Sequence, residues 1–297
     1  MKLLTTAMTI DDIAILADAG ADGLLFGTAF FSLRAAAVFE EAQLAEIVKR
    51  CHECKVEMRV LVNRMFDEHE LSRIKEHLSY LKEIGTDAIY FSDEAVLALA
   101  TELEMTHLLI YQSDTLLTNH MDVNYYLAEG IQGVVLAKEI TLNEITAIAQ
   151  ASDASKTELI GHGYLTMMHS RRKLLSNYME HLNRDDKLFG CDHLTIEEAT
   201  RHEAMPVYED AYGTHVFSAF VQKSFTEFKQ LTEVNIGAMR IDGIFHTGAD
   251  IAFILSIYDR LRKQEIDSEE AEELYRSHFP KQLSTSGFYY QATGTSK

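Results

Sequence analysis

The sequence predicts an α/β protein built as a TIM-like (β/α)8 barrel, with a long insertion between the seventh and eighth strands. Eight short apolar runs alternate with amphipathic helices along the 297 residues, and this alternation is typical of parallel strands joined by right-handed crossovers. Gly-containing turns precede several of the strands, as at residues 19–22, 84–87 and 129–130. Eight such units favour a closed barrel, although periodicity alone leaves an open doubly wound sheet as an alternative.

The strand–helix units are predicted from the period of the apolar residues. The predicted strands cover residues 3–6, 23–27, 58–62, 88–91, 108–111, 133–136, 158–160 and 238–241. The predicted helices cover residues 11–19, 43–53, 68–84, 94–103, 123–128, 142–150 and 249–263. In the first helix Ile13, Leu16 and Ala17 share one face. Gly20 follows this helix and suits the left-handed residue that ends it.

The segment between the seventh and eighth strands is much longer than an ordinary loop. It is predicted to hold a basic helix at residues 170–178, a strand at 215–217 and a helix at 225–232. Insertions on the top face of a barrel usually shape its site. We therefore assign residues 1–267 to the barrel, including a top-face insertion at about 164–235, and residues 268–297 to a tail that packs on or near the barrel.

Composition restricts the class of protein. Hydrophobic residues make up 47% and charged residues 25%, which are ordinary values for a globular chain. Lys and Arg number 27 against 46 Asp and Glu, giving a net charge of −19. This charge opposes polyanion binding over the whole surface, so nucleic acid would need a local basic patch or a partner. Three Cys form no closed disulfide framework and no apolar stretch could span a membrane, so a cytoplasmic protein is predicted.

Polar residues at the ends of the predicted strands are the candidate site, because a barrel gathers its strand ends at one face. These residues are Thr6, Gly27, Asn63, Asp93, Gln112, Lys138 with Glu139, His162 and Asp242. The predicted ligand-binding set among them and nearby is Asn63, Gln112, Lys138 and Arg240. Donors and cations suit a small anionic ligand. Structural ion pairs among Asp93, Lys138, Glu139 and Arg240 are the alternative.

His162, Glu139 and Asp93 are the predicted catalytic residues. His162 is assigned as a general base or ligand donor, with a packed histidine at a strand end as the alternative. His169 follows it, but no third ligand stands at a fixed spacing, so no metal site is predicted. The sequence contains no GxSxG, HExxH, Walker A or GxGxxG motif.

Two further motifs contain residue types that carry chemistry. Ser170-Arg171-Arg172-Lys173 is the sharpest basic cluster of an acidic chain, and Arg171 and Arg172 are predicted to hold a phosphate or carboxylate unless they form a solvated helix face. Cys51 and Cys54 have CxxC spacing, but they come at the end of a helix, where the helix dipole opposes a thiolate. The pair is therefore interpreted as two ordinary helix-face cysteines.

Residues 158–177, ELIGHGYLTMMHSRRKLLSN, resemble the signature of the collagenase-like U32 peptidase family. That signature runs Glu-x-Phe-x-x-Gly-(Ala or Ser)-aliphatic-Cys-x4-Gly-x-Cys-x-aliphatic-Ser. The ungapped matches are Glu158, Gly163, Leu165, Leu175 and Ser176. Residues 20–34, 85–93, 136–140 and 240–243 also resemble family segments, in the same order and at similar spacing.

The departures from this signature bear on function. Thr166 and Lys173 occupy the places of the two signature cysteines. Family members of this kind hold an iron–sulfur cluster on four cysteines, and Thr and Lys cannot replace thiolate ligands. The resemblance therefore implies a member with no cofactor bound by its own residues.

The resemblance implies three functions, which the sequence leaves open. One family branch hydroxylates the wobble uridine of tRNA with prephenate as a co-substrate, and a short member can accompany a longer, cysteine-complete paralogue. The chain looks like that short partner, with tRNA contacted through the paralogue. A peptidase, for which Ser176 and His162 could be proposed, is the second function, and a non-catalytic binding barrel is the third. Ser176 also belongs to the predicted ligand-binding residues, with Arg171 and Arg172.

Overall fold

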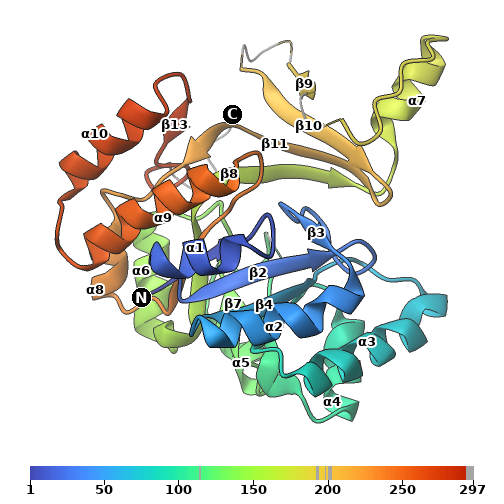
Figure 1. The fold of residues 1–297 in the computed structure, drawn as a ribbon, viewed down its shortest axis with the longest axis horizontal. Coiled ribbons are helices and arrows are strands. Elements are labelled where there is room, and N and C mark those ends of the chain that lie inside the picture. Colours follow the sequence, from blue (N-terminus) through green and yellow to red (C-terminus); the bar gives the residue numbers. More distant parts are fainter. Residues whose placement is uncertain (114, 192–193, 198, 200–202, 292–297) are drawn as a thin grey trace.

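Eight parallel strands close into a barrel in the computed structural model, which describes residues 1–113, 115–191, 194–197, 199 and 203–291 (Figure 1). The barrel strands are β1 (Lys2–Thr6), β2 (Gly23–Thr28), β4 (Glu57–Val62), β5 (Ala88–Phe91), β6 (Leu109–Tyr111), β7 (Gly133–Val135), β8 (Thr157–Ser170) and β12 (Ala238–Ile241). They pair in this order, and β12 pairs with both β8 and β1. This closure confirms the predicted barrel and excludes the open sheet.

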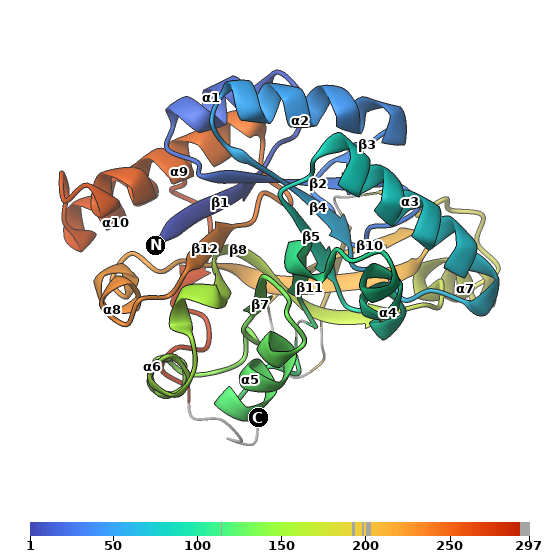
Figure 2. The same ribbon diagram turned by 90° about the horizontal axis from the view of Figure 1, so that it is seen from below.

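Helices surround the barrel, as Figure 2 shows. They are α1 (Asp12–Asp18), α2 (Leu44–Glu53), α3 (Leu71–Ile84), α4 (Glu94–Glu102), α5 (His120–Ala128), α6 (Leu142–Ala151), α8 (Phe228–Glu233) and α9 (Gly248–Arg262). Short 3₁₀ turns occur at Glu41–Gln43, Glu68–Glu70, Thr106–Leu108 and Ala154–Lys156. Capping boxes start several elements, such as the Thr141–Glu144 pair at α6. Among the described residues, no helix is both long and apolar enough to cross a bilayer.

The period of two along each strand separates two hydrophobic cores. The larger core lies between the outer face of the strands and the helices. The smaller core fills the barrel interior and consists of Leu4, Leu25, Leu61, Ala88, Tyr90, Ile110, Val135 and Ala238. The barrel is therefore a packed body rather than a pore, and ligands can enter only at its ends.

A buried polar network lies among the first residues of the strands. The Arg59 guanidinium donates to the Glu158 carboxylate at 2.5 Å and to the Tyr90 hydroxyl at 2.8 Å. The Tyr90 hydroxyl in turn donates to Glu158 at 2.7 Å, and Glu57 accepts from Arg59 at 2.6 Å. Arg59 is 3% exposed and Glu158 7%. Because each charge has a partner, this network is stable in the interior and fills the end of the barrel opposite the candidate site.

β8 leaves the barrel and continues into a second sheet, which explains why the seventh strand is longer than predicted. This sheet is antiparallel in the order β8-β11-β10-β9, with β9 (Leu194–Ile196), β10 (Met205–Asp210) and β11 (Gly213–Gln222). The predicted strand at 215–217 lies within β11. Gly213 begins β11 at φ +131°, and a Cβ there would lie 1.9 Å from the Ser170 carbonyl oxygen, so only glycine fits. Two short strands pair at the margins, β3 (Val38–Phe39) with β2 and β13 (Ser284–Thr285) with β11.

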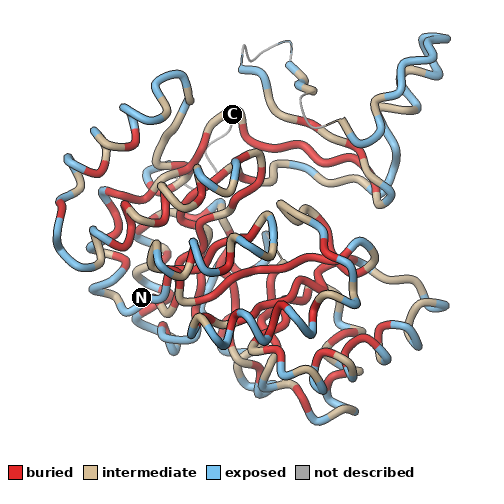
Figure 3. The backbone as a smooth tube through the Cα atoms, in the orientation of Figure 1, coloured by how far each residue is buried: buried red, intermediate tan, exposed pale blue. Residues whose placement is uncertain are grey.

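The predicted basic helix starts later than expected. α7 covers Leu174–His181, so Arg171, Arg172 and Lys173 precede it rather than lie on it. The reason is tertiary, since Ser170 still pairs with Thr214 in the second sheet. None of the α7 residues is buried (Figure 3), and Figure 1 shows the helix projecting from the body. The helix predicted at 225–232 is present as α8.

The chain after residue 267 forms α10 (Ser268–His278) and then returns across the barrel. Asp267 and Glu270 form a capping box at the start of α10. Tyr289 is 5% exposed; its hydroxyl lies 2.8 Å from Ser224 Oγ, and its carbonyl accepts from the Leu142 amide at 3.0 Å. Residues 292–297 of the predicted tail lie outside the described residues.

Candidate functional site

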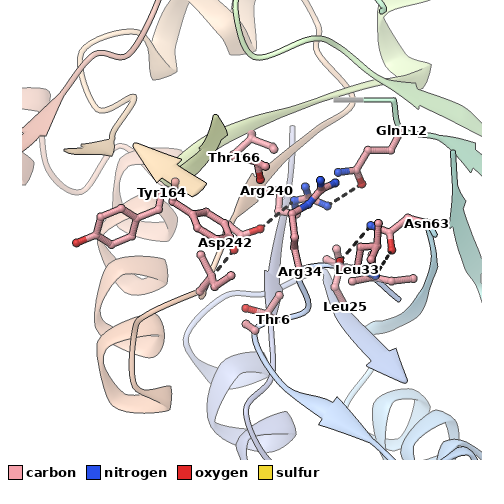
Figure 4. A pocket seen from close by; sticks show the side chains of 15 residues that line it. Thr6, Leu25, Leu33, Arg34, Asn63, Gln112, Tyr164, Thr166, Arg240 and Asp242 are labelled. Carbon is pink, nitrogen blue, oxygen red and sulfur yellow. Dashed lines mark hydrogen bonds and ion pairs between the residues drawn. The ribbon is translucent and has the colours of Figure 1, made fainter. Parts of the chain in front are cut away.

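A small pocket lies where the barrel strands end, and we name it the mouth pocket (Figure 4). Its polar lining from the strand ends consists of Thr6, Asn63, Gln112, Arg240 and Asp242. These residues are far apart in sequence, and parallel strands bring their carboxyl ends to one face. The cavity is about 30 Å³, which is room for roughly two water molecules or one small polar group.

Arg240 is the central cation of the mouth pocket. Its side chain is buried, at 6% exposure, and its Nη1 donates to Gln112 Oε1 at 3.0 Å. Its Nε lies 3.7 Å from Asp242 Oδ2 and, among the described residues, has no hydrogen-bond acceptor. Figure 4 shows the guanidinium between Gln112 and Asp242. A buried guanidinium with an unused donor is suited to a carboxylate or another small anion.

Arg34 brings a second guanidinium to the mouth pocket from the loop after β2. Its backbone is left-handed at φ 54°, which is uncommon for a residue with a side chain and is often found at functional sites. Asn63 holds this loop, since its Oδ1 accepts from the Leu33 amide at 2.9 Å. Asn63 therefore positions the loop that carries Arg34, in addition to lining the pocket.

The second sheet forms the roof of the mouth pocket. Tyr164 and Thr166 of β8 and Phe217 of β11 line the pocket from this sheet. Thr166 stands where the family signature places its first cysteine. The departure from the signature therefore changes the wall of the candidate site itself.

Two further cavities adjoin the mouth pocket. A cleft of about 680 Å³, named here the hairpin cleft, lies between the 29–38 loop, the β10–β11 hairpin and the loop before α9, and shares Arg34 with the mouth pocket. An edge pocket of about 120 Å³ is lined by Leu33, Arg64, Met65, His169, Arg171, Ala211 and Tyr212. The edge pocket shares Ala211 and Tyr212 with the hairpin cleft. The three cavities are therefore neighbours that share parts of their walls.

The structure gathers some of the predicted ligand-binding residues and not others. Asn63, Gln112 and Arg240 meet at the mouth pocket. Lys138, which is half-buried, and Glu139, which is exposed, do not line it. β7 ends at Val135 and the chain then turns into the outer core, so these two residues come too late to face the mouth.

His162 lies outside the mouth pocket, contrary to the predicted role as a base there. It is fully buried against the outer face of the barrel, with Nδ1 3.1 Å from the Tyr258 hydroxyl and its ring next to Phe225 and Tyr275. The β8–β12 register shifts between Ile160 and His162, and this irregularity turns the side chain outward. Burial lowers the pKa of His162 well below its usual value, so the ring is neutral and the packed alternative fits its surroundings.

Asp93 serves as the N-cap of α4 rather than as a catalytic acid. Its Oδ1 accepts from the Ala95 amide at 2.9 Å, and its Oδ2 accepts from the Phe66 amide at 2.8 Å. Both oxygens are therefore bound to backbone donors, which fixes the carboxylate in a structural position. The predicted catalytic set of His162, Glu139 and Asp93 is not brought together.

The residues predicted from the basic cluster lie beside the cavities rather than in the mouth pocket. Arg171 lines the edge pocket and pairs with Asp67 at 2.9 Å, while Arg172 is exposed. Ser176 lies in the first turn of α7 and donates its hydroxyl to the buried Glu209 carboxylate.

Glu209 anchors the start of α7. Besides the Ser176 hydroxyl, it accepts from the Leu175 amide at 2.9 Å and the Thr214 hydroxyl at 3.1 Å. A carboxylate bound in this way stabilises a helix N-terminus. The Ser176–Glu209 pair thus has a structural role.

The residues that sequence reasoning missed come from loops and from the insertion. Arg34, Tyr164 and Thr166 line the mouth pocket, yet none stands at a predicted strand end. Arg34 and Thr166 entered the sequence argument only through the family resemblance. Arg34 could have been predicted as a site residue because it is an arginine in a loop between two strand–helix units of the barrel.

The cysteines do not fit the iron–sulfur cluster known from the family. A cluster of this kind needs four thiolates, and the chain has three Cys in all. Cys51 and Cys54 are on or at the end of α2 outside the barrel, and burial raises the pKa of Cys51 to about 12. Among the described residues, no group of three or more His, Cys, Asp and Glu side chains is arranged to hold a metal ion.

Comparison with known proteins identifies the family. The model of peptidase family U32 matches residues 8–297. The tRNA hydroxylation protein P2 of Bacillus subtilis (strain 168) is 30% identical over 249 residues, which cover 82% of this chain and 79% of that protein. The tRNA hydroxylation protein P of Escherichia coli (strain K12) is 24% identical over 82% of this chain and 63% of that protein.

A relative of the same family carries a different name. The uncharacterized protease MJ0090 of Methanocaldococcus jannaschii is 28% identical over 198 residues, which cover 64% of this chain and 48% of that protein. The chain thus spans only about half of this relative but most of protein P2. The match to the family model extends over nearly the whole sequence, and the chain belongs to peptidase family U32.

Proposed function

We propose that the chain is a subunit or partner in the 5-hydroxylation of the tRNA wobble uridine. Its similarity to a protein named for tRNA hydroxylation extends over most of both chains. The observation that supports the proposal in the structure is the buried Arg240, whose Nε has no hydrogen-bond acceptor among the described residues at the barrel mouth. Arg240 is ion-paired with Asp242 at 3.7 Å, and its unused Nε donor is suited to the carboxylate of a small ligand.

Prephenate is the co-substrate in this proposal, by resemblance to the family branch. It carries two carboxylates, and the two guanidinium groups of Arg34 and Arg240 both line the mouth pocket. The pocket of about 30 Å³ accepts only one carboxylate-sized group. The remainder of the molecule would extend into the hairpin cleft, which Arg34 also lines.

The chemistry of an iron–sulfur cluster would come from a partner. The chain lacks the four thiolates that a cluster requires, so a longer, cysteine-complete U32 paralogue is the proposed source. In this division of work the present chain binds and orients small ligands or RNA. The net charge of −19 leaves the greater share of phosphate neutralisation to that paralogue.

The test is a deletion strain in which any redundant hydroxylation pathway is also removed. Nucleosides derived from 5-hydroxyuridine should disappear from its tRNA and return when the wild-type chain is supplied, as measured by mass spectrometry. Arg240→Gln should restore less than about one tenth of the wild-type level, because losing a charged hydrogen bond to a ligand costs about 1.5–3 kcal/mol. Arg276→Ala, an exposed change on α10, is the matched control and should restore fully.

Normal nucleoside levels in the deletion strain would refute the proposal. Arg34→Ala serves as a second variant, since Arg34 lies in a loop and its loss leaves the barrel interior intact. Both variants are checked for folding by thermal unfolding. Full restoration by folded Arg240→Gln and Arg34→Ala would favour a non-catalytic binding barrel instead.

Peptidase activity, which the family name suggests, finds no support in the geometry of Ser176. Its hydroxyl donates to a carboxylate that also caps α7, and an acyl-transfer nucleophile needs a base free to take its proton. Purified chain that cleaved gelatin, with loss of cleavage in Ser176→Ala, would reinstate this activity.

A further inference from the structure

The hairpin cleft combines features with which proteins bind a nucleic-acid base. The ligand proposed above would fill only part of this cleft. Its volume is about 680 Å³, which is ample for one nucleoside. Its aromatic lining includes Phe189, Tyr208, Tyr212 and Phe245. Aromatic faces beside cations are the common means by which proteins hold single-stranded RNA.

The rings of Tyr208 and Phe245 lie next to each other in the wall of the cleft, with centroids 6.4 Å apart and planes nearly perpendicular, and both are supported from behind. Tyr208 stacks on Phe217 with centroids 5.7 Å apart. Phe245 packs edge-to-face on Phe217 at 5.1 Å and on Tyr164 at 5.4 Å. Both rings are half-buried, so each keeps part of its surface toward the cleft. Rings fixed in this way stack on a base with little loss of side-chain entropy.

Cations follow the rim of the same surface. Arg34 lines the cleft, whereas Arg64, which lies over the Tyr212 ring at 4.5 Å, is buried and paired with Glu70 at 2.7 Å. Lys173 lies 5.3 Å from the centre of the Phe189 ring. Arg171 pairs with Asp67, but both side chains are about half exposed, and such surface pairs are weak enough to exchange for a phosphate.

The two carboxylates of the lining are already paired. The Asp210 carboxylate lies 3.1 Å from His215 Nε2 and accepts from the Tyr212 amide at 2.8 Å. Glu209 is occupied by the first turn of α7. Both carboxylates are therefore held by groups of the protein, and the guanidinium groups of Arg34 and Arg171 have to offset their negative charge when a phosphate enters.

We propose that the hairpin cleft receives one unstacked nucleoside of an RNA substrate, with its base in the corner that the Phe245 and Tyr208 rings form and its neighbouring phosphates at Arg34 and Arg171. The inference rests on the proposed function and deepens it, because it assigns direct RNA contact to this chain. In this arrangement the base in the cleft lies next to the mouth pocket, which shares Arg34 with it. A small anion bound at Arg240 and the base in the cleft would then lie on either side of the loop that carries Arg34.

The test measures binding of a fluorescent tRNA anticodon stem-loop, with uridine at the first anticodon position, to the full chain at low salt. Phe245→Ala should weaken the Kd roughly 5- to 100-fold, since one base–aromatic stack is lost. Arg34→Ala should lower the slope of log K against log salt by about one. Tyr125→Ala, which removes an aromatic ring that is 64% exposed on α5, is the matched control and should bind like the wild type.

A photocrosslink locates the base independently of affinity. With 5-iodouridine at the same position, the crosslinked peptide should fall within residues 203–213 or 243–250. Phe245→Leu retains apolar bulk against Phe217, so it keeps the test valid if Phe245→Ala fails to fold. It should lose the crosslink at residues 243–250 and weaken binding.

Each outcome separates the cleft from the proposed function. Wild-type chain that does not bind the stem-loop, variants that bind within twofold of wild type, or crosslinks confined to other peptides would overturn the cleft inference and leave the deletion result standing. Protection of the cleft peptides from hydrogen exchange by the paralogue without RNA would assign the cleft to a protein and overturn the inference equally. Normal nucleosides in the deletion strain, with the crosslink in the cleft, would refute only the proposed reaction.

Discussion

Arg240 and His162 lie on neighbouring strands, but only Arg240 faces the mouth pocket. Arg240 follows the regular alternation of β12 and points into the barrel mouth. His162 comes after the register shift on β8 and points into the outer core. The same polar character thus gives a candidate ligand-binding cation at one position and a packed neutral ring at the other. Sequence period cannot separate these cases, because the shift depends on the pairing partner.

Burial of His162 predicts a pH dependence of stability. Burial lowers its pKa in the folded state well below the usual 6.5, so below about pH 6.5 the unfolded chain binds a proton that the folded chain does not. The free energy of unfolding should therefore fall as the pH drops from 6.5 toward 5, by up to about 1.4 kcal/mol per pH unit for this group. Urea unfolding at several pH values measures this slope.

His162→Gln should reduce the slope whatever its effect on absolute stability, because glutamine does not titrate. Burial also lowers the pKa values of His77, His169 and His246. The free energy of unfolding of the variant should therefore still depend on pH, with a smaller slope. His107→Gln, at an exposed position, is the control. An unchanged slope in His162→Gln would contradict the assignment of His162 as the main buried titrating group.

At the scale of elements, β8 has two roles. Its first half closes the barrel with β12 and β7, and its second half supports the antiparallel sheet that roofs the mouth. The chain then enters α7 through Arg171, Arg172 and Lys173. α7 buries none of its residues, so its position depends on the few polar contacts at its first turn.

Glu209→Gln should loosen α7 while leaving the barrel intact. The carboxylate accepts from the Leu175 and Ser176 amides and from two hydroxyls, and the amide side chain accepts these bonds less well and brings a donor among them. The α7 amides should exchange with deuterium roughly tenfold faster or more, corresponding to a loss of about 1.4 kcal/mol. Glu180→Gln, exposed on the same helix, should leave exchange unchanged. Equal exchange in the two variants would rule out Glu209 as the anchor.

At the scale of the whole molecule, the chain after α10 packs against the barrel and connects segments that are distant in sequence. Tyr289 links the Ser224 hydroxyl with the Leu142 amide at the start of α6. These hydrogen bonds of Tyr289 lie beside the aromatic cluster of His162, Phe225 and Tyr258, since the Tyr258 hydroxyl accepts from the Ser224 amide at 3.0 Å. The tail therefore contributes to the stability of the barrel.

Tyr289→Ala should destabilise the whole chain by about 3–5 kcal/mol, as expected when a buried aromatic ring is removed. Urea unfolding followed by circular dichroism measures the change. Tyr290→Ala removes a neighbouring ring that is 66% exposed and should cost less than about 1 kcal/mol. Similar losses in the two variants would show that the tail does not fasten the barrel at Tyr289.

The sequence alone determined the eight strand–helix units, because the apolar period and the glycine turns are local. All eight strands begin within a few residues of their predicted positions, although β8 continues to Ser170. Asn63, Gln112 and Arg240 meet at the mouth because strand ends converge in any closed barrel. The family followed from residues 158–177 together with the shorter matching segments, and the comparison with known proteins confirmed it.

Only the tertiary structure decided closure, the roof of the mouth and which polar side chains face it. The β8 register shift turned His162 outward, Asp93 was taken by the α4 N-terminus, and the early end of β7 kept Lys138 and Glu139 out of the pocket lining. Arg34 entered the site through a loop held by Asn63. Each of these outcomes depends on hydrogen bonds and pairing between segments far apart in the chain, and local residue patterns do not encode them.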